Sequence, residues 1–152
     1  NRGPAGVVNT GKIQWFEPMD RKVGPATGFS VDALDKLPRV DVIYAHANMS
    51  ADLIDAAIKN GAKGLVIAGV GDGNMTTPAL DAVTRAAKSG IVVVRSTRLA
   101  SGITLRNNEV NDDEKGLVAS GELNPAKSRV LLQLALTKTN DPVQIQRMFY
   151  EY

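Results

Sequence analysis

The chain has 152 residues, of which 43% are hydrophobic, and this is enough for one compact domain with a buried core, with or without an appendage. It contains no cysteine and one histidine, which excludes disulfides, thiol catalysis and a metal site made of several histidines. The net charge of +2 comes without a run of Lys and Arg, so we expect no nucleic-acid partner. The longest apolar runs, such as residues 90–94, are far too short to cross a membrane.

Residues 1–16 have the pattern of a β-hairpin. Apolar segments at 5–8 and 12–16 flank the sequence Asn-Thr-Gly, which supplies the residue types that a tight turn needs. An isolated hairpin is marginal in water, so we expect this one to belong to a larger domain that the rest of the chain does not supply. Residues 17–38 carry three prolines and two glycines and are interpreted as a linker between domains.

Residues 39–152 alternate strand and helix patterns, which predicts the α/β fold class. Apolar runs separated by amphipathic segments are typical of βαβ units, so we expect a small three-layer domain with a parallel sheet. The expected strands are residues 40–44, 65–68 and 91–94, with a weaker one at 116–119.

Four helices are expected in this domain. The first is capped by Ser50, stopped by Asn60, and presents an apolar face of Leu53, Ile54, Ala57 and Ile58. The others are a helix over 78–88 capped by Thr77, a largely buried one over 125–136, and a last one that follows Asp141 and bears Ile145, Met148, Phe149 and Tyr152 on one side.

The most informative stretch is the strand at 65–68 and the loop that follows it. Glycines at positions 69, 71 and 73 end the strand and permit backbone angles that other residues avoid. A polar, glycine-rich loop at the carboxyl end of a parallel strand is where open α/β sheets bind their ligands. We therefore expect Asp72 and Asn74 to lie near a ligand.

A dinucleotide-binding loop is disfavoured for this stretch. The third glycine of that fingerprint would fall at Asn74, and Asp72 would repel the pyrophosphate. His46 is expected to hydrogen-bond a backbone carbonyl rather than to act in catalysis. The hydroxyls of residues 96, 97 and 101 have no evident base to activate them, and the acidic run at 112–114 is interpreted as solvated charge at a helix start.

Glu109 differs from the other acidic residues because it lies between two apolar stretches in the loop after a strand. Glu109 and Asn74 follow adjacent parallel strands, so both are expected at the same edge of the sheet. A carboxylate beside an amide suits a ligand that carries an ammonium group and other polar atoms.

Taken together, these segments resemble the C-terminal portion of bacterial type II L-asparaginases and glutaminase-asparaginases. The resemblance covers essentially the whole chain. It rests on the hairpin at 9–13 and on the segments 68–74, 93–98, 109–110, 119–127 and 129–136.

This resemblance implies hydrolysis of the side-chain amide of L-asparagine or L-glutamine by a threonine nucleophile. That threonine lies in a Thr-Gly-Gly-Thr motif, which does not occur in this sequence. No catalytic residue is therefore expected here, and no cofactor or metal is implied. The chain is expected to be the C-terminal part of a longer protein, in which residues 1–16 complete the N-terminal domain.

The resemblance also implies a periplasmic homotetramer in which each active site is closed by a neighbouring subunit. Within this picture Glu109 pairs with the substrate's α-ammonium, and Asn74 hydrogen-bonds the substrate and supports its catalytic neighbours. Asp72 stands where some members of the family have Asn, which bears on the preference between asparagine and glutamine.

Two other interpretations remain open from the sequence. The chain could be a stand-alone, flavodoxin-like module that binds a small polar ligand at the same edge of the sheet. It could also serve only as a tetramerisation domain, in which case Glu109 would not matter for activity.

Overall fold

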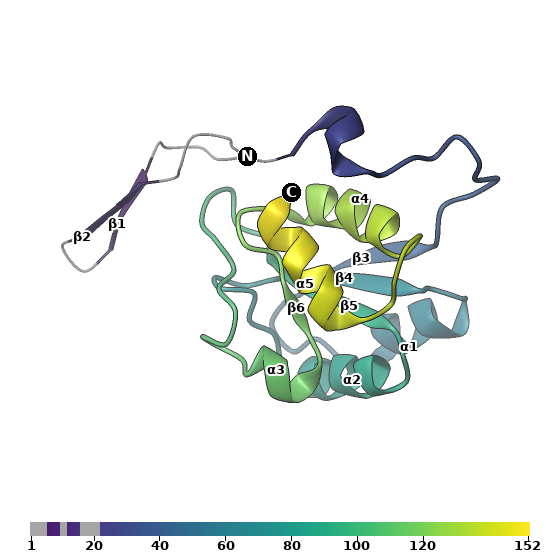
Figure 1. The fold of residues 1–152 in the computed structure, drawn as a ribbon. Coiled ribbons are helices and arrows are strands. Elements are labelled where there is room, and N and C mark those ends of the chain that lie inside the picture. The colour runs from purple at the N-terminus through teal and green to yellow at the C-terminus, as the bar shows by residue number, and fades with distance from the viewer. Residues whose placement is uncertain (1–5, 10–11, 16–21) are drawn as a thin grey trace.

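The computed structural model describes residues 6–9, 12–15 and 22–152, and within these ranges four parallel strands form one sheet (Figure 1). The strands lie in the order β3-β4-β5-β6. Their bounds are Val40–Tyr44 for β3, Gly64–Gly69 for β4, Val92–Thr97 for β5 and Val118–Ala119 for β6. The predicted parallel α/β sheet is confirmed, and its weak fourth strand is only two residues long.

Helices cover both faces of this sheet, so the domain has three layers (Figure 1). One face carries α1, α2 and the short α3, and the other carries α4 and α5. Their bounds are Asp52–Lys59, Thr77–Lys88, Asp112–Lys115, Pro125–Ala135 and Pro142–Glu151. None of the helices in the described ranges is both long and apolar enough to span a bilayer.

The central strand β4 explains why two layers of helices are needed. Leu65 and Ile67 belong to the hydrophobic cluster that includes α1 and α2, whereas Val66 belongs to the cluster under α4 and α5. Because successive side chains of a strand point to opposite faces, a strand covered on both sides must be apolar throughout. All residues of β4 are buried, which is why its sequence shows a continuous apolar run.

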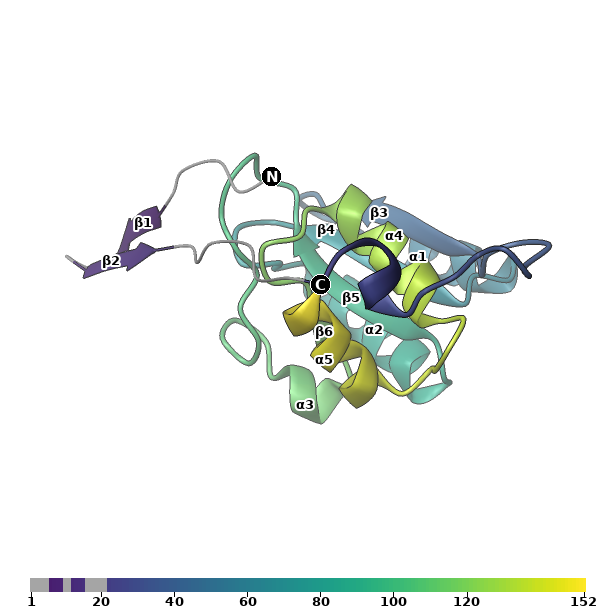
Figure 2. The same cartoon turned by 45° about the horizontal axis from the view of Figure 1, so that its top comes forward.

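The predicted hairpin is present as β1 and β2. Strand Gly6–Asn9 pairs antiparallel with Lys12–Trp15, and the two form their own sheet, while its turn and residues 16–21 lie outside the described residues. In the predicted linker, residues 22–38 are mostly exposed and contain one 3-10 helix, η1 at Gly24–Thr27. This segment lies beside α4 and α5 (Figure 2), where Tyr152 Oη donates to Thr27 O at 3.0 Å.

Some sequence-based details of the helices were wrong. Leu53 is 58% exposed, because it lies 100° round the helix from Ile54, at the margin of the stripe that packs on the sheet. The N-cap of α2 is Thr76 rather than Thr77, and its Oγ1 accepts from Ala79 N. Helix α4 is only partly buried, since Val130 is 52% exposed. The apolar side predicted for α5 is confirmed.

Candidate functional site

The loop after β4 lies at the carboxyl edge of the sheet and folds back on itself. Val70 N donates to Asn74 O and Asn74 N donates to Val70 O, both at 2.8 Å, so residues 70–74 form a closed turn. A Cβ atom at Gly69 would lie 2.4 Å from the backbone carbon of Gly73, so only glycine allows this approach. The turn presents the side chain of Asn74 to solvent.

Asn74 and Glu109 meet at this edge. Nδ2 of Asn74 donates to Oε2 of Glu109 at 3.3 Å, while Oδ1 of Asn74 accepts from Met75 N at 2.8 Å. Both side chains are exposed, but Glu109 is followed by Val110, which is buried in the core and anchors the loop. The prediction that the two residues emerge side by side is confirmed.

A pocket of about 470 Å³ opens beside this pair. Apolar and polar side chains line it together, and the polar ones include His46, Asn74, Thr76, Arg98 and Glu109. A carboxylate, an amide and a guanidinium around one hollow suit a small ligand that carries several polar groups. A larger hollow of about 760 Å³ lies between η1 and α4, but the described residues that line it are mainly apolar and include no carboxylate.

Asp72 lies at the same edge, but its carboxylate is engaged within the protein. Oδ1 accepts from Leu105 N at 2.5 Å, and Oδ2 accepts from Asn108 Nδ2 at 2.6 Å. The residue thus connects the turn at 70–74 to the loop that carries Glu109. Asp72 also lines the pocket, and both oxygens of its carboxylate are bonded within the protein.

The other candidate side chains of the sequence have local partners. His46 Nδ1 lies 2.8 Å from Ala47 O, so the expected bond to a backbone carbonyl is confirmed. Ser96 Oγ donates to Leu123 O at 2.9 Å, and Thr97 Oγ1 accepts from Leu99 N. Within the described residues, neither hydroxyl is bonded to a side chain that could act as its base.

The sequence reasoning missed a buried ion pair beneath the site. Arg95 Nε donates to Asp112 Oδ1 at 2.6 Å and Nη2 donates to Oδ2 at 2.8 Å, with both side chains fully buried. The interpretation of residues 112–114 as solvated charge was therefore wrong for Asp112. The available signal was an arginine at the end of the run Val-Val-Val, because a charge inside a buried strand needs a partner.

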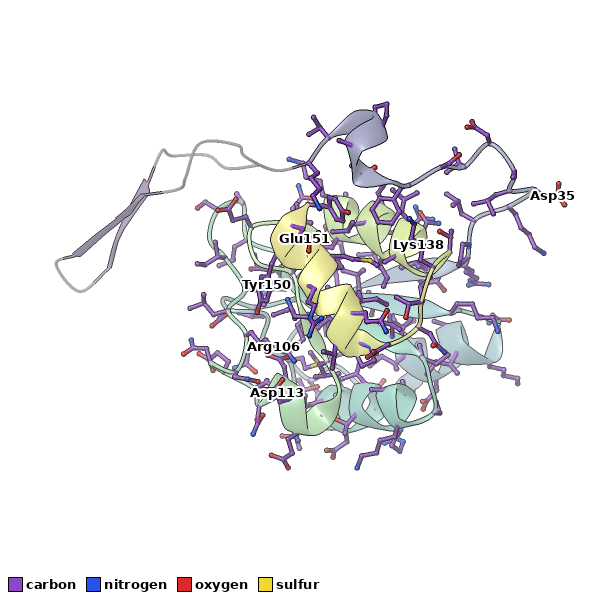
Figure 3. The ribbon with its side chains drawn as sticks, in the orientation of Figure 1. Asp35, Arg106, Asp113, Lys138, Tyr150 and Glu151 are labelled. Carbon is purple, nitrogen blue, oxygen red and sulfur yellow. The ribbon has the colours of Figure 1, made fainter. Side chains whose placement is uncertain are left out.

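The neighbouring Asp113 is exposed and behaves as expected for a surface carboxylate with partners. Asn107 Nδ2 donates to its Oδ2 at 2.5 Å, and Arg106 donates to its Oδ1 (Figure 3). The hydrogen bond from Asn107, followed by the one from Arg106, lowers the pKa of Asp113 below its ordinary value. Arg106 also donates to Gln146 of α5 at 2.7 Å and so ties the loop to the other side of the sheet.

Comparison with known proteins identifies the domain. Residues 39–149 match the family model of the glutaminase/asparaginase C-terminal domain. The chain is 51% identical over 140 residues to L-asparaginase 2 of Bacillus subtilis, covering 92% of the chain and 37% of that protein. It is 45% identical over 152 residues to a probable periplasmic L-asparaginase of Haemophilus influenzae, covering 100% and 44%.

A glutaminase-asparaginase of Pseudomonas fluorescens is 36% identical over 151 residues, which cover 99% of the chain and 42% of that protein. The chain thus spans less than half the length of each of these relatives. The match to the family model covers most of the chain and contains the whole parallel sheet. This chain belongs to the glutaminase/asparaginase family and carries its C-terminal domain.

Proposed function

We propose that this chain is the C-terminal part of an amidohydrolase that hydrolyses the side-chain amide of L-asparagine, L-glutamine or both and releases ammonia. The observation that carries the proposal is the pairing of Asn74 with Glu109 beside a pocket that Arg98 also lines, in a domain of this family. The names of the relatives, L-asparaginase and glutaminase-asparaginase, support the substrate class.

Glu109 is proposed to bind the α-ammonium group of the substrate. Its Oε2 already accepts from Asn74, and within the described residues its Oε1 makes no hydrogen bond. An ammonium group that enters the pocket therefore finds a free carboxylate oxygen. Asn74 has a second N–H on Nδ2, which can donate to a polar atom of the same ligand.

The chemical step is proposed to use a threonine in the part of the relatives that this chain does not match. The threonine hydroxyl attacks the amide carbon, its proton passes to the leaving nitrogen, and the C–N bond breaks to release ammonia. Water then hydrolyses the acyl-enzyme to the acid and restores the hydroxyl. In this scheme residues 22–152 contribute binding and orientation of the substrate, and no cofactor or metal is required.

The wider organisation of the protein is also a proposal. Residues 1–16 complete an N-terminal domain, residues 17–38 link it to the domain at 39–152, and four copies assemble so that Asn74 and Glu109 close a neighbour's active site. A periplasmic location is supported by the name of the relative from Haemophilus influenzae.

The proposal is tested by measuring ammonia release from L-asparagine and L-glutamine. The longer protein of which this chain is proposed to be a part should hydrolyse at least one of them. The chain of 152 residues by itself should hydrolyse neither, because acyl transfer needs an activated nucleophile. If the longer protein only binds these amino acids and never releases ammonia, the chain is part of a binding module instead.

A further inference from the structure

The guanidinium of Arg95 lies directly beneath the two loops of the site. Its Nη1 donates to Asp72 O at 2.7 Å and to Gly73 O at 3.4 Å, both in the turn that carries Asn74. Its Nη2 donates to Leu105 O at 3.0 Å, in the loop that carries Glu109. One side chain thus holds carbonyl groups of both loops.

Asp112 completes this arrangement. Its carboxylate accepts hydrogen bonds from Nε and Nη2 of Arg95. Each of the five N–H groups of the guanidinium therefore has an acceptor. Oδ2 of Asp112 also accepts from Asn107 N at 2.9 Å, two residues before Glu109. The buried pair is therefore bonded to the Glu109 loop at two points.

A direct hydrogen bond also joins the two loops. Leu105 N donates to the carboxylate of Asp72 in the Asn74 loop, and Leu105 O accepts from Arg95. Gly73 allows the close approach: a Cβ there would lie 3.0 Å from Arg95 Nη1 and 2.9 Å from Thr104 Cγ2. The two loops are thus fixed to each other at short range.

We propose that Arg95 is a positioning residue that holds the Asn74 loop (residues 70–74) and the Glu109 loop (residues 104–109) in one arrangement, so that Asn74 and Glu109 meet the substrate as a preformed pair. The role in substrate binding rests on the proposed function. Stability alone does not explain the residue, because well-packed apolar side chains often replace a buried ion pair without loss. An apolar side chain could fill the space, but it could not hold the carbonyls of both loops.

The first test is a double-mutant cycle in the longer enzyme with Arg95→Lys and Glu109→Gln. Lysine keeps the charge, but it has three donors instead of a five-donor fork and cannot hold both loops and Asp112. Arg95→Lys should lower kcat/KM at least ten-fold, mainly by raising KM for the amino-acid substrate. In the Glu109→Gln background it should cause little further loss, because the pair that it positions is already broken. Equal losses in both backgrounds would show a general structural effect and overturn the proposal.

The second test does not depend on activity. Backbone amide exchange should become faster at residues 70–74 and 104–109 in Arg95→Lys and stay unchanged in α1 and α2. The control is Arg39→Lys, which alters another bidentate arginine–aspartate pair at the opposite edge of the sheet and should leave both loops as they are. Unchanged exchange in the two loops of Arg95→Lys would overturn the proposal.

Arg95→Met combined with Asp112→Asn serves if Arg95→Lys does not fold. It removes both buried charges, keeps the volume of the unbranched stem, and leaves an acceptor for Asn107 N. The same faster exchange in both loops is expected, and its absence counts against the proposal. If the longer protein has no amidase activity, the proposed function fails, while the exchange experiment still decides whether Arg95 fixes the loops.

Discussion

The side-chain amide of Asn74 donates to the carboxylate of Glu109 at 3.3 Å, across 35 positions of the sequence. The bond joins two loops that leave adjacent parallel strands at the same edge of the sheet. It leaves one oxygen of Glu109 without a hydrogen bond within the described residues, beside a pocket of about 470 Å³. The following predictions concern this pair and the loops that carry it.

Glu109→Gln in the longer enzyme should lower kcat/KM for L-asparagine or L-glutamine by about one to two orders of magnitude. The reason is the loss of a charge-assisted bond to the ammonium group, which contributes about 1.5–3 kcal/mol. Steady-state kinetics measures the effect. An amide substrate that lacks the α-amino group should be hydrolysed almost equally well by both proteins.

The matched control for this variant is Glu151→Gln, at the end of α5 (Figure 3), which is not among the residues that line the pocket. It makes the same chemical change on an exposed carboxylate that pairs with Lys22. It should leave kcat/KM unchanged. Equal losses for substrates with and without an α-amino group would show that Glu109 does not bind the ammonium.

Gly73→Ala should destabilise the protein more than Gly71→Ala. Both glycines have positive φ angles, +75° and +55°, so both substitutions place a side chain in the left-handed region, at a cost of about 1–2 kcal/mol. At Gly71 a Cβ meets nothing within 4 Å, whereas at Gly73 it lies 2.9 Å from Thr104 Cγ2. Urea denaturation gives the two free energies of unfolding. Equal destabilisation would mean that the loop relaxes away from Thr104 and Arg95.

The pattern of apolar runs was sufficient to predict the sheet and most of the helices. Strands β4 and β5 are buried throughout and β3 is buried or half-buried except at Tyr44, so each leaves a mainly apolar segment in the sequence. The first residue of α2 was harder to predict. Thr76 and Thr77 are equally good caps by residue type, and the backbone angles decide which of them caps the helix. Leu53 was misplaced because Ile54 and Leu53 are both apolar and only one can face the sheet.

The meeting of Asn74 and Glu109 could be predicted, because topology alone brings both residues to one edge of the sheet. The buried ion pair beneath these two residues could not be predicted from the sequence. Arg95 and Asp112 are separated by a loop whose path has no periodic signal, and their bond depends on how residues 104–109 fold back over the sheet. Asp72 was expected at the pocket, but its engagement with Leu105 depends on the same path.

Asp113→Asn should make the stability of the protein less dependent on acid pH. The hydrogen bonds from Asn107 and Arg106 lower the pKa of Asp113 in the folded state. Their contribution is therefore complete above the ordinary aspartate pKa of about 3.9 and is lost as the pH falls through the lower, folded value. Urea denaturation at pH 7 and at pH values below about 4 should show a difference between wild type and variant that shrinks with acid. A difference that stays constant would exclude the ionised form of Asp113 as its source.

The last prediction is that Glu109 acts on a substrate bound by a neighbouring subunit. Subunits of the longer enzyme that carry Glu109→Gln keep the nucleophilic threonine but lack the ammonium contact. Subunits without that threonine keep Glu109. If the two residues of one site come from different chains, dissociating both variants and reassembling them together creates sites with an intact threonine and an intact Glu109.

The mixed, reassembled enzyme should therefore show more ammonia release from L-asparagine or L-glutamine than the sum of the two parents. The control is the same mixture without dissociation, in which no hybrid assembles and no activity is gained. The KM of the recovered activity should equal that of wild type, because the recovered sites contain both native side chains. If Glu109 served its own subunit, no chain in the mixture would carry both residues, and reassembly would give no activity above the parental sum.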